Sequence, residues 1–362
     1  MFKKLDLYIL KKFGGTFFLM IFLFILIAVV FDISEKIDDF EKFTMNEIIF
    51  DYYFSFIPWL FNLLTPILAF LTVVYFTGRM ASKTEIIPIL ASGISFKRLL
   101  RPYLFGGIAL FILSLLLSHI LIPITNKKRI AIEARIYTHS RRINNTKLHR
   151  EIAKDHFIYV QNYSNKSSSA YKFRLEKIVD GELLYRFTAN NMKWNNKKQN
   201  WSARSWAERT IEKDKETLIQ GNNKDTTFRF GEYVFDNTEF KRSPYEVETM
   251  DIFDIFDFIE KEKMRGSSHL GMYQQELVKR TSNPFSIIIL VLIAACISSR
   301  KVKGGVGMHV AIGIGIALVF TFFQIIAEKI SVHTPIPAEF ALWVPNIFFA
   351  FVAIFIYVKA PK

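Results

Sequence analysis

The sequence predicts an α-helical membrane protein with six transmembrane helices and an inserted all-β domain between the third and fourth helices. Two patterns support this fold class: six long runs without charge, and a block of short aromatic and β-branched runs between the third and fourth of them. Of the 362 residues, 51% are hydrophobic and 37 are Phe. This composition is too apolar for an ordinary pair of soluble domains.

Each uncharged run is long enough to cross a bilayer, which needs about 20 residues of helix. No A-x-A-like cleavage site follows the first run, so we interpret it as a membrane span rather than a signal peptide. The six runs lie between Lys12 and Asp32, Asp51 and Arg79, Arg101 and Lys127, Arg280 and Arg300, Lys303 and Glu328, and Glu339 and Lys359.

These runs divide the chain into two membrane halves with an insertion between them. We expect transmembrane helices at 13–33, 55–78, 102–124, 281–299, 306–328 and 340–358, and a short helix at 82–92. The corresponding parts are a first membrane half at 1–126, a β domain with a basic lead-in helix at 127–245, a helical return at 246–280 and a second membrane half at 281–362.

The charges of the short loops predict the orientation. The N-terminus, the 79–101 loop, the 300–303 turn and the C-terminal tail are basic, whereas the 32–51 loop has seven acidic residues against two lysines. Cytoplasmic loops carry the excess of Lys and Arg, so both termini are expected inside and the β domain outside. The basic 127–280 segment is no exception, because long translocated domains escape this rule.

The β domain is predicted from short runs with partial alternation. Examples are HFIYVQNY, AYKFRLEKIV, ELLYRFTA, NWSARSWAERTI and TTFRFGEYVF, with turn signals at Asp180-Gly181, Asn195-Asn196 and Gly221-Asn222-Asn223. This spacing favours an antiparallel sandwich or jelly roll. Before it, the basic segment from Lys127 to Arg150 is expected to extend the third span as a helix, and the chain returns to helix after Pro244.

The polar segment from Arg79 to Arg101 lies between two apolar runs and has the pattern of a short helix. Thr84 is expected to cap its start beside Glu85, and Gly93 to end it. Ser95 can cap the next helix. Such a helix at the cytoplasmic end of a bundle is well placed to receive force from a soluble partner, and the alternative is a linker that turns the chain around.

The motifs of catalysis and metal binding are absent from the sequence. The carboxylates of 251–260 recur every three residues, as expected of an amphipathic surface helix, and the seven His form no H-x-x-x-H pair. The glycines near 304–315 lack the G-x-x-x-x-G-K-[ST] order, so the chain cannot hydrolyse nucleotide by itself. The net charge of +14 has no accompanying nucleic-acid motif, and the single Cys296 excludes an internal disulfide.

The predicted spans contain few polar residues. Intramembrane polar groups face cavities or pair across helices. The sequence has no buried chain of acids of the kind that a proton-coupled carrier needs. The residues are Asn62, Thr65, His119, His309 and Gln324, with Glu328 at the end of the fifth span.

The arrangement of three spans, a β-rich insertion and three further spans resembles the LptF/LptG (YjgP/YjgQ) family of lipopolysaccharide-export permeases. The most specific stretch is GRMASKTEIIPILASGISFKRLLRPYL, in which Arg79, Glu85, Ser92-Gly93-Ile94-Ser95 and Pro102 follow the family's order. FTANNMKWNNKKQNW is similar to a family strand pair, with Asn191 replacing a small residue, and YQQELVKRTSNPFSIIIL is similar to the approach to the fourth span. Pro88 departs from the family's usual Leu/Ala-rich helix.

The resemblance implies a permease subunit of an ABC transporter in the inner membrane of a Gram-negative bacterium, with a periplasmic jelly-roll-like domain. Its implied partners are a paired homologous permease, a cytoplasmic ABC ATPase dimer that uses ATP, a periplasmic jelly-roll bridge protein and lipopolysaccharide. The 82–92 helix would be the coupling helix that contacts the ATPase. The implied contact residues are Arg79, Ser82, Glu85, Ile86, Ile89, Leu90 and Gly93.

The resemblance also implies that lipid A enters a cavity between the two permeases and passes to the β domain. Basic residues at the outer rim are expected to contact its phosphates. The candidates are Lys36, Lys42, Lys127, Lys128 and Arg129. The alternatives are a permease for another envelope lipid and a membrane-anchored periplasmic scaffold or ligand-binding protein that transports nothing.

Overall fold

The computed structural model describes residues 4–137, 145–164, 167–212, 215–230, 233–237, 240, 244–264, 267 and 269–360. The chain forms two compact units. We call the first the membrane unit; it comprises Met1–Ile136, Val247–Ile255 and Gly271–Lys362. The second, the β unit, comprises Tyr137–Glu246 and Phe256–Leu270. The β unit is therefore an insertion in the membrane unit.

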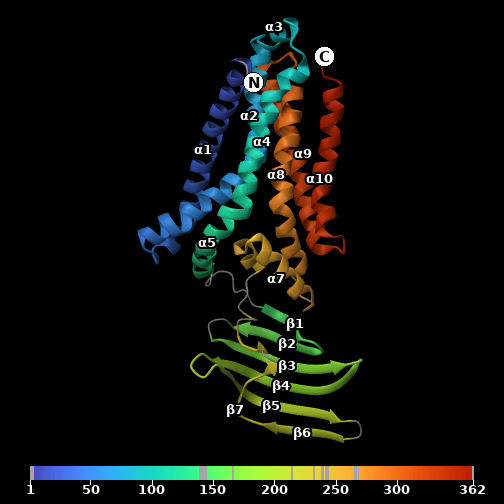
Figure 1. The fold of residues 1–362 in the computed structure, drawn as a ribbon. Helices are drawn as coiled ribbons and strands as arrows, with labels where there is room; N and C mark the ends of the chain where they lie inside the picture. Colours follow the sequence, from blue (N-terminus) through green and yellow to red (C-terminus); the bar gives the residue numbers. More distant parts are fainter. Residues whose placement is uncertain are drawn as a thin grey trace. The chain divides into compact units, whose positions relative to one another are not determined.

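The described residues of the membrane unit include six helical segments that are long and apolar enough to cross a membrane, which confirms the predicted fold class. Two of the segments are continuous helices with a π-helical turn, and the membrane helices are shown in Figure 1. The segments are α1 (Lys4–Phe40); η1 (Glu47–Tyr53) with α2 (Phe54–Ser82); α4 (Phe96–Leu116), η2 (Leu117–Leu121) and α5 (Ile122–Tyr137); α8 (Leu270–Ser298); α9 (Gly305–His333); and α10 (Ala338–Val358).

The core of the membrane unit lies around α2 and α8, the two most buried of the six segments. Small residues let α9 approach α2 closely: a Cβ on Gly78 would lie 3.0 Å from the His309 side chain, and one on Gly313 would lie 3.0 Å from Val74. Small residues at helix crossings are typical of membrane bundles. In contrast, α1 and α9 leave most of their apolar surface uncovered, as expected of helices that face lipid or another subunit.

The β unit contains a seven-stranded antiparallel sheet in which consecutive strands pair from β1 to β6 (Figure 1). Strand β7 pairs with Trp201–Ala203 of β5, the part of β5 that β6 does not reach. A separate ribbon pairs β8 with β9. The strands are β1 (Asn145–Ala153), β2 (His156–Ser164), β3 (Ser169–Val179), β4 (Glu182–Asn195), β5 (Asn200–Glu212), β6 (Lys215–Gly221), β7 (Lys224–Thr226), β8 (Arg229–Phe230) and β9 (Tyr233–Val234).

The predicted turns lie between strands: residues 180–181 join β3 to β4, 196–199 join β4 to β5, and 222–223 join β6 to β7. Asp180 and Gly181 both have positive φ, as a tight two-residue hairpin requires. Because the large sheet is built from such short hairpins, its described strands follow one another in sequence order, without the crossover connections of a jelly roll.

Two segments differ from the expected secondary structure. The helical extension predicted through Arg150 is wrong from Asn145 onward, because Asn145–Ala153 is strand β1. Helix α5 is described through Tyr137, and the part of the prediction at 138–144 lies outside the described residues. Leu148, Arg150 and Ile152 alternate along β1 and are buried, so the inward face includes a charged residue that conceals the strand pattern in the sequence. Strand β6, KETLIQG, was also not predicted, because it lies at the exposed edge of the sheet and buries little.

Aromatic side chains fill the interior of the β unit. Phe228 and Phe235 come from the segment after β7 and pack against Phe173, Phe187 and Trp201 on the large sheet. The Trp201 indole donates a hydrogen bond to the Phe235 carbonyl oxygen at 3.1 Å, which satisfies the polar atom of a fully buried ring. The return to helix occurs through η3 (Pro244–Thr249) and α7 (Ile252–Met264), which precede α8.

Candidate functional site

The short helix between α2 and α4 is α3 (Ile86–Ala91), which is shorter than the predicted 82–92. The chain leaves α2 after Ser82 through a tight turn in which Thr84 has φ 55°, and the Glu85 N–H bonds to the Met80 carbonyl oxygen. The prediction that Thr84 caps the helix is wrong: Glu85 occupies the cap position, and the Thr84 hydroxyl donates to the Lys83 carbonyl oxygen instead.

The other end of α3 is formed as predicted. Gly93 has φ +84°, a left-handed conformation that favours glycine, and its N–H bonds to the Leu90 carbonyl oxygen at 3.1 Å. Ser95 then caps α4, where its hydroxyl accepts a hydrogen bond from the Arg98 N–H at 3.3 Å. Turns at both ends therefore hold α3 as a separate short helix between two membrane helices.

Glu85 is tied to the N-terminal part of α1. Its Oε2 accepts hydrogen bonds from the Tyr8 hydroxyl at 2.9 Å and from the Lys12 Nζ at 3.2 Å. Desolvation acts to raise the pKa of Glu85, but these hydrogen bonds and the positive charges of Lys12 and Lys83 together outweigh it, so the pKa is lowered. Glu85 is therefore a carboxylate that remains partly exposed, with no described residue hydrogen-bonded to its Oε1.

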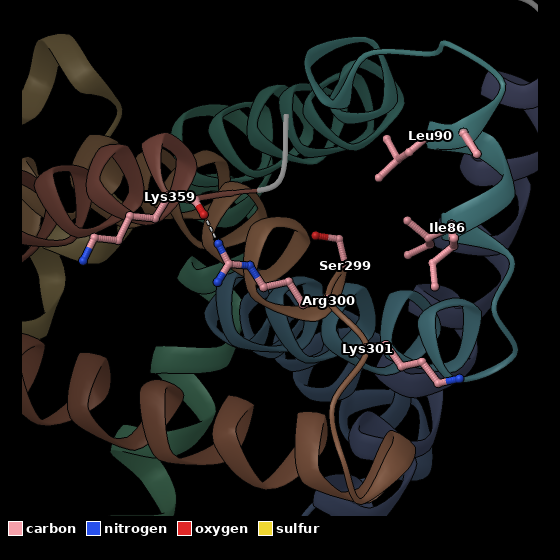
Figure 2. Close-up of a pocket in the computed structure, with 8 residues that line it drawn as sticks. Ile86, Leu90, Ser299, Arg300, Lys301 and Lys359 are labelled. Carbon is pink, nitrogen blue, oxygen red and sulfur yellow. Dashed lines mark hydrogen bonds between the residues drawn. The ribbon is translucent and has the colours of Figure 1, made fainter.

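A pocket of about 610 Å³ lies between α3 and the ends of α8 and α10 (Figure 2). The α3 side is apolar, whereas the opposite side has three cationic residues, Arg300, Lys301 and Lys359, for which we call this cavity the basic pocket. The Arg300 guanidinium donates to the Lys359 carbonyl oxygen and so links the ends of α8 and α10. The lining residues are Ile86, Ile87, Leu90, Ala91, Ser299, Arg300, Lys301 and Lys359.

The exposed surface of α3 differs from the expected contact set. Ile86 is 1% exposed and belongs to the membrane core, and Ile89 and Leu90 are partly buried against that core. Ile87, which the sequence analysis did not select, is 54% exposed. The other expected contact residues are more accessible: Arg79 and Gly93 are exposed, and Ser82 is half-buried. Helical periodicity showed an apolar face but not which isoleucine the bundle covers.

The cationic residues selected as phosphate contacts lie at the opposite end of the membrane unit, and two of them are buried. Lys36 is 8% exposed; it forms an ion pair with Asp32 and a hydrogen bond with the Tyr52 hydroxyl. Tyr52 and Tyr53 also donate to the Asp32 carboxylate, at 3.1 and 3.0 Å. This buried cluster attaches the end of α1 to η1. The sequence around Lys36 alone does not show this contact, because the partners in this cluster, Tyr52 and Tyr53, belong to a different helix.

Arg129 is the second buried cation. Its guanidinium contacts the Glu248 carboxylate at 3.1 Å and lies 4.5 Å from the centre of the Trp59 ring. Burial raises the pKa of Glu248 to about 7, and the neighbouring Glu276 acts in the same direction, whereas Arg129 opposes it. Arg280 donates to the Met250 and Val247 carbonyl oxygens at 2.7 and 2.9 Å. These contacts hold Val247–Met250 inside the membrane unit, to which that segment belongs.

The three remaining cations are exposed. Lys128 pairs with Asp51 at 2.6 Å and Lys42 with Asp39 at 3.3 Å, both as partly solvated ion pairs. Lys127 forms no ion pair with any residue that the structure describes. Lys42, Lys127 and Lys128 are therefore the accessible members of the predicted set.

Polar residues inside the spans hold helices together. The Asn62 side chain donates to the Ser118 hydroxyl at 2.8 Å and accepts from the Ser114 hydroxyl at 2.5 Å, which joins α2 to the α4–η2 helix. Among the described residues, no group of His, Cys, Asp and Glu side chains could hold a metal ion.

The fold and the site together define the class of protein. It is a multi-pass membrane protein with an inserted β domain and a short helix beside the basic pocket, and its sequence has no nucleotide-binding motif. The comparison with protein families then identifies the family. The model of the lipopolysaccharide export system permease LptF/LptG matches residues 7–359, and the chain belongs to this family. It is therefore a transporter component and a multi-pass inner-membrane protein. No individual curated protein matches the chain.

Proposed function

We propose that this chain is the permease subunit that extracts lipopolysaccharide from the outer leaflet of the inner membrane, driven by a separate cytoplasmic ATPase. The observation that supports this most directly is α3, a short helix held by turns at both ends beside a basic pocket. The family match supports the export role. The sequence lacks the Walker motif, so ATP would be bound and hydrolysed by the partner.

The α3 end of the membrane unit lies in the cytoplasm in this proposal. The basic loops all fall at this end, in agreement with the positive-inside rule. Ile87 and the rim of the pocket would then contact the ATPase, with Arg79, Ser82, Glu85, Ile89, Leu90 and Gly93 around them. An exposed isoleucine beside partly buried apolar residues is the kind of anchor that fills a groove in a partner protein.

At the opposite end, the exposed Lys42, Lys127 and Lys128 would contact the phosphates of lipid A. The buried Lys36 and Arg129 would hold α1 and η3 in place around them. A paired homologous permease would cover part of the uncovered α1 and α9 surface. The exposed β6 edge, with Leu218 and Ile219, offers unpaired backbone groups to which a periplasmic bridge protein would add a strand.

Copurification tests the proposal. The full chain, tagged and purified from the cells that make it, is expected to bring an ABC ATPase and a second permease, identified by mass spectrometry. Ile87→Asp places a charge on the exposed face of α3 and should cause loss of the ATPase while the protein stays in the membrane. The matched control is Phe253→Asp on α7, where an apolar residue that is even more exposed lies outside the contact. Purification without any ATPase would contradict the proposal.

A further inference from the structure

The N-terminal part of α1 is bonded to both sides of α3. On the C-terminal side, the Asp6 carboxylate forms a bidentate ion pair with the Arg98 guanidinium, with N to O distances of 2.6 and 2.5 Å. Asp6 is only 2% exposed. Bidentate pairs of this kind fix the relative orientation of their partners, unlike the single contacts of exposed ion pairs. Arg98 is in the first turn of α4, directly after the Ser95 cap.

On the N-terminal side of α3, the bond is the contact of Glu85 with Tyr8 and Lys12. Tyr8 and Lys12 are four residues apart on one face of α1, and the Lys12 Nζ also lies 4.3 Å from the centre of the Tyr8 ring. Both side chains donate a hydrogen bond to the same oxygen of Glu85, the residue in the cap position directly before α3. The start and the end of the α3 segment are therefore attached to α1 within two helical turns.

Between its two ends, α1 packs on α2 and α4 along one side only. Its buried apolar side chains form a narrow line through Ile9, Phe13, Phe17 and Ile21, and most of its remaining surface is uncovered. At its far end, the Asp32 and Lys36 cluster attaches it to η1. A helix attached by polar contacts at its two ends and by one apolar line between them can transmit a displacement from one end to the other.

We propose that Asp6–Arg98 and Glu85 with Tyr8 and Lys12 form a two-point clamp that makes α3 and α1 move as one body. Asp6 and Arg98 are positioning residues: they do not contact the ATPase or the lipid, but carry the displacement of α3 to α1 and hence to the exposed lysines. This inference rests on the proposed function, because it assigns to α1 the route by which the ATPase drives lipid extraction.

Charge reversal of the ion pair tests the clamp. The complex is purified with its copurifying ATPase and reconstituted in nanodiscs that contain lipopolysaccharide, and ATP hydrolysis and lipid extraction are measured together. Asp6→Arg and Arg98→Asp should each lower the lipid extracted per ATP hydrolysed by about 3- to 30-fold, the range of coupling losses along such networks, with basal hydrolysis retained. The double reversal restores opposite charges and should recover most of the loss.

The matched control is Lys11→Glu, which reverses a charge on an exposed α1 residue that no described residue pairs with. This variant should leave the amount of lipid extracted per ATP hydrolysed unchanged. The proposal is overturned if both single reversals keep the wild-type ratio, or if the double reversal is as uncoupled as the single variants.

A distance measurement reports on the clamp without requiring lipid transport. Spin labels are attached to cysteines introduced by Leu7→Cys and Ser92→Cys. Labelling is selective because both positions are exposed and the native Cys296 is buried, and Ser92 lies outside the proposed ATPase contact set. The wild-type distance distribution should be narrow and unchanged by nucleotide, and Arg98→Asp should broaden it. A broad wild-type distribution would overturn the clamp. If the wild-type complex hydrolyses ATP but extracts no lipid, the proposed function fails, whereas the distances between Leu7→Cys and Ser92→Cys still decide whether the clamp exists.

Discussion

Glu248 shows how a single residue depends on its surroundings. It lies in η3, between the Arg129 guanidinium and the carboxylates of Glu276 and Glu133, with Lys279 also near. Desolvation is the largest influence and raises the pKa of Glu248 from 4.5 to about 7. Its ionisation therefore falls within the physiological range, although the sequence around it, PYEVETM, has no feature that would indicate this.

The raised pKa predicts a pH-dependent stability. The folded protein holds the Glu248 proton more tightly than the unfolded chain does, so the stability from this group is present below about pH 4.5 and is lost as the pH rises through about 7. Glu248→Gln cannot ionise and should remove this dependence. The free energy of unfolding of the wild type, measured relative to this variant, should therefore fall by about 1 to 3 kcal/mol as the pH rises from about 5.5 to about 8.5.

Thermal unfolding of the purified protein at pH 5.5, 7.0 and 8.5 measures this effect. The control is Glu260→Gln, an exposed carboxylate on α7. A wild-type melting temperature that does not decline relative to the Glu248→Gln variant between pH 5.5 and 8.5 would contradict the interpretation.

Helix α1 contacts α4 at Gly106. Of the described glycines, Gly106 leaves the least room for a Cβ atom. A Cβ on Gly106 would lie 2.5 Å from the Phe13 ring, closer than van der Waals contact allows, and Phe13 is buried. The same ring stacks on Phe76 at a centroid distance of 6.0 Å. Gly106 therefore determines how closely α1 packs on the membrane unit.

Gly106→Ala is expected to separate α1 from α4 and to destabilise the membrane unit by about 1 to 3 kcal/mol, the usual cost of an overpacked core. Gly14→Ala is the matched control, because a Cβ at Gly14 meets nothing within 4 Å. Its better helix propensity should leave the stability equal or slightly raised. Thermal unfolding in the same detergent compares the two variants, and equal melting temperatures would show that the Phe13 ring can move aside.

At the scale of the whole molecule, the membrane unit has differently built ends. One end presents α3 and the basic pocket, and the other presents exposed lysines around a buried ionic framework. Contacts from η1 to α5, such as Asp51 with Lys128 and Glu47 with Arg135, hold that second end together. This arrangement fits the proposed function, in which energy enters at one end of the membrane unit and an anionic lipid is bound at the other.

The exposed lysines provide a test of this arrangement. Replacing Lys42, Lys127 and Lys128 together with Gln should raise the lipopolysaccharide concentration needed to stimulate ATP hydrolysis by roughly 100-fold, since each lost cation near an anionic membrane surface is worth about 1 kcal/mol and each 1.4 kcal/mol is a factor of about ten. Replacing the exposed Lys11, Lys97 and Lys303 with Gln removes the same charge from the α3 end and serves as the control. Unchanged stimulation in the first variant would exclude these lysines from lipid binding.

The sequence by itself determined the six spans, the inserted β domain, the stop at Gly93 and the Ser95 cap. These features depend on local properties: an uncharged run, alternating side chains or the conformational freedom of one glycine. A residue's neighbours along the chain decide them, so they can be predicted without knowledge of the packing.

Only the tertiary structure decided which of the selected residues are accessible. Ile86 is covered by the bundle while Ile87 remains exposed. Lys36 and Arg129 are buried in ion pairs, whereas Lys127 pairs with no residue in the described part of the chain. Asp6 and Arg98 are 92 residues apart, and Arg129 and Glu248 are 119 apart. The physical reason is that burial and charge pairing depend on the helices that meet in space, and nothing local in the sequence specifies which partner each charge finds.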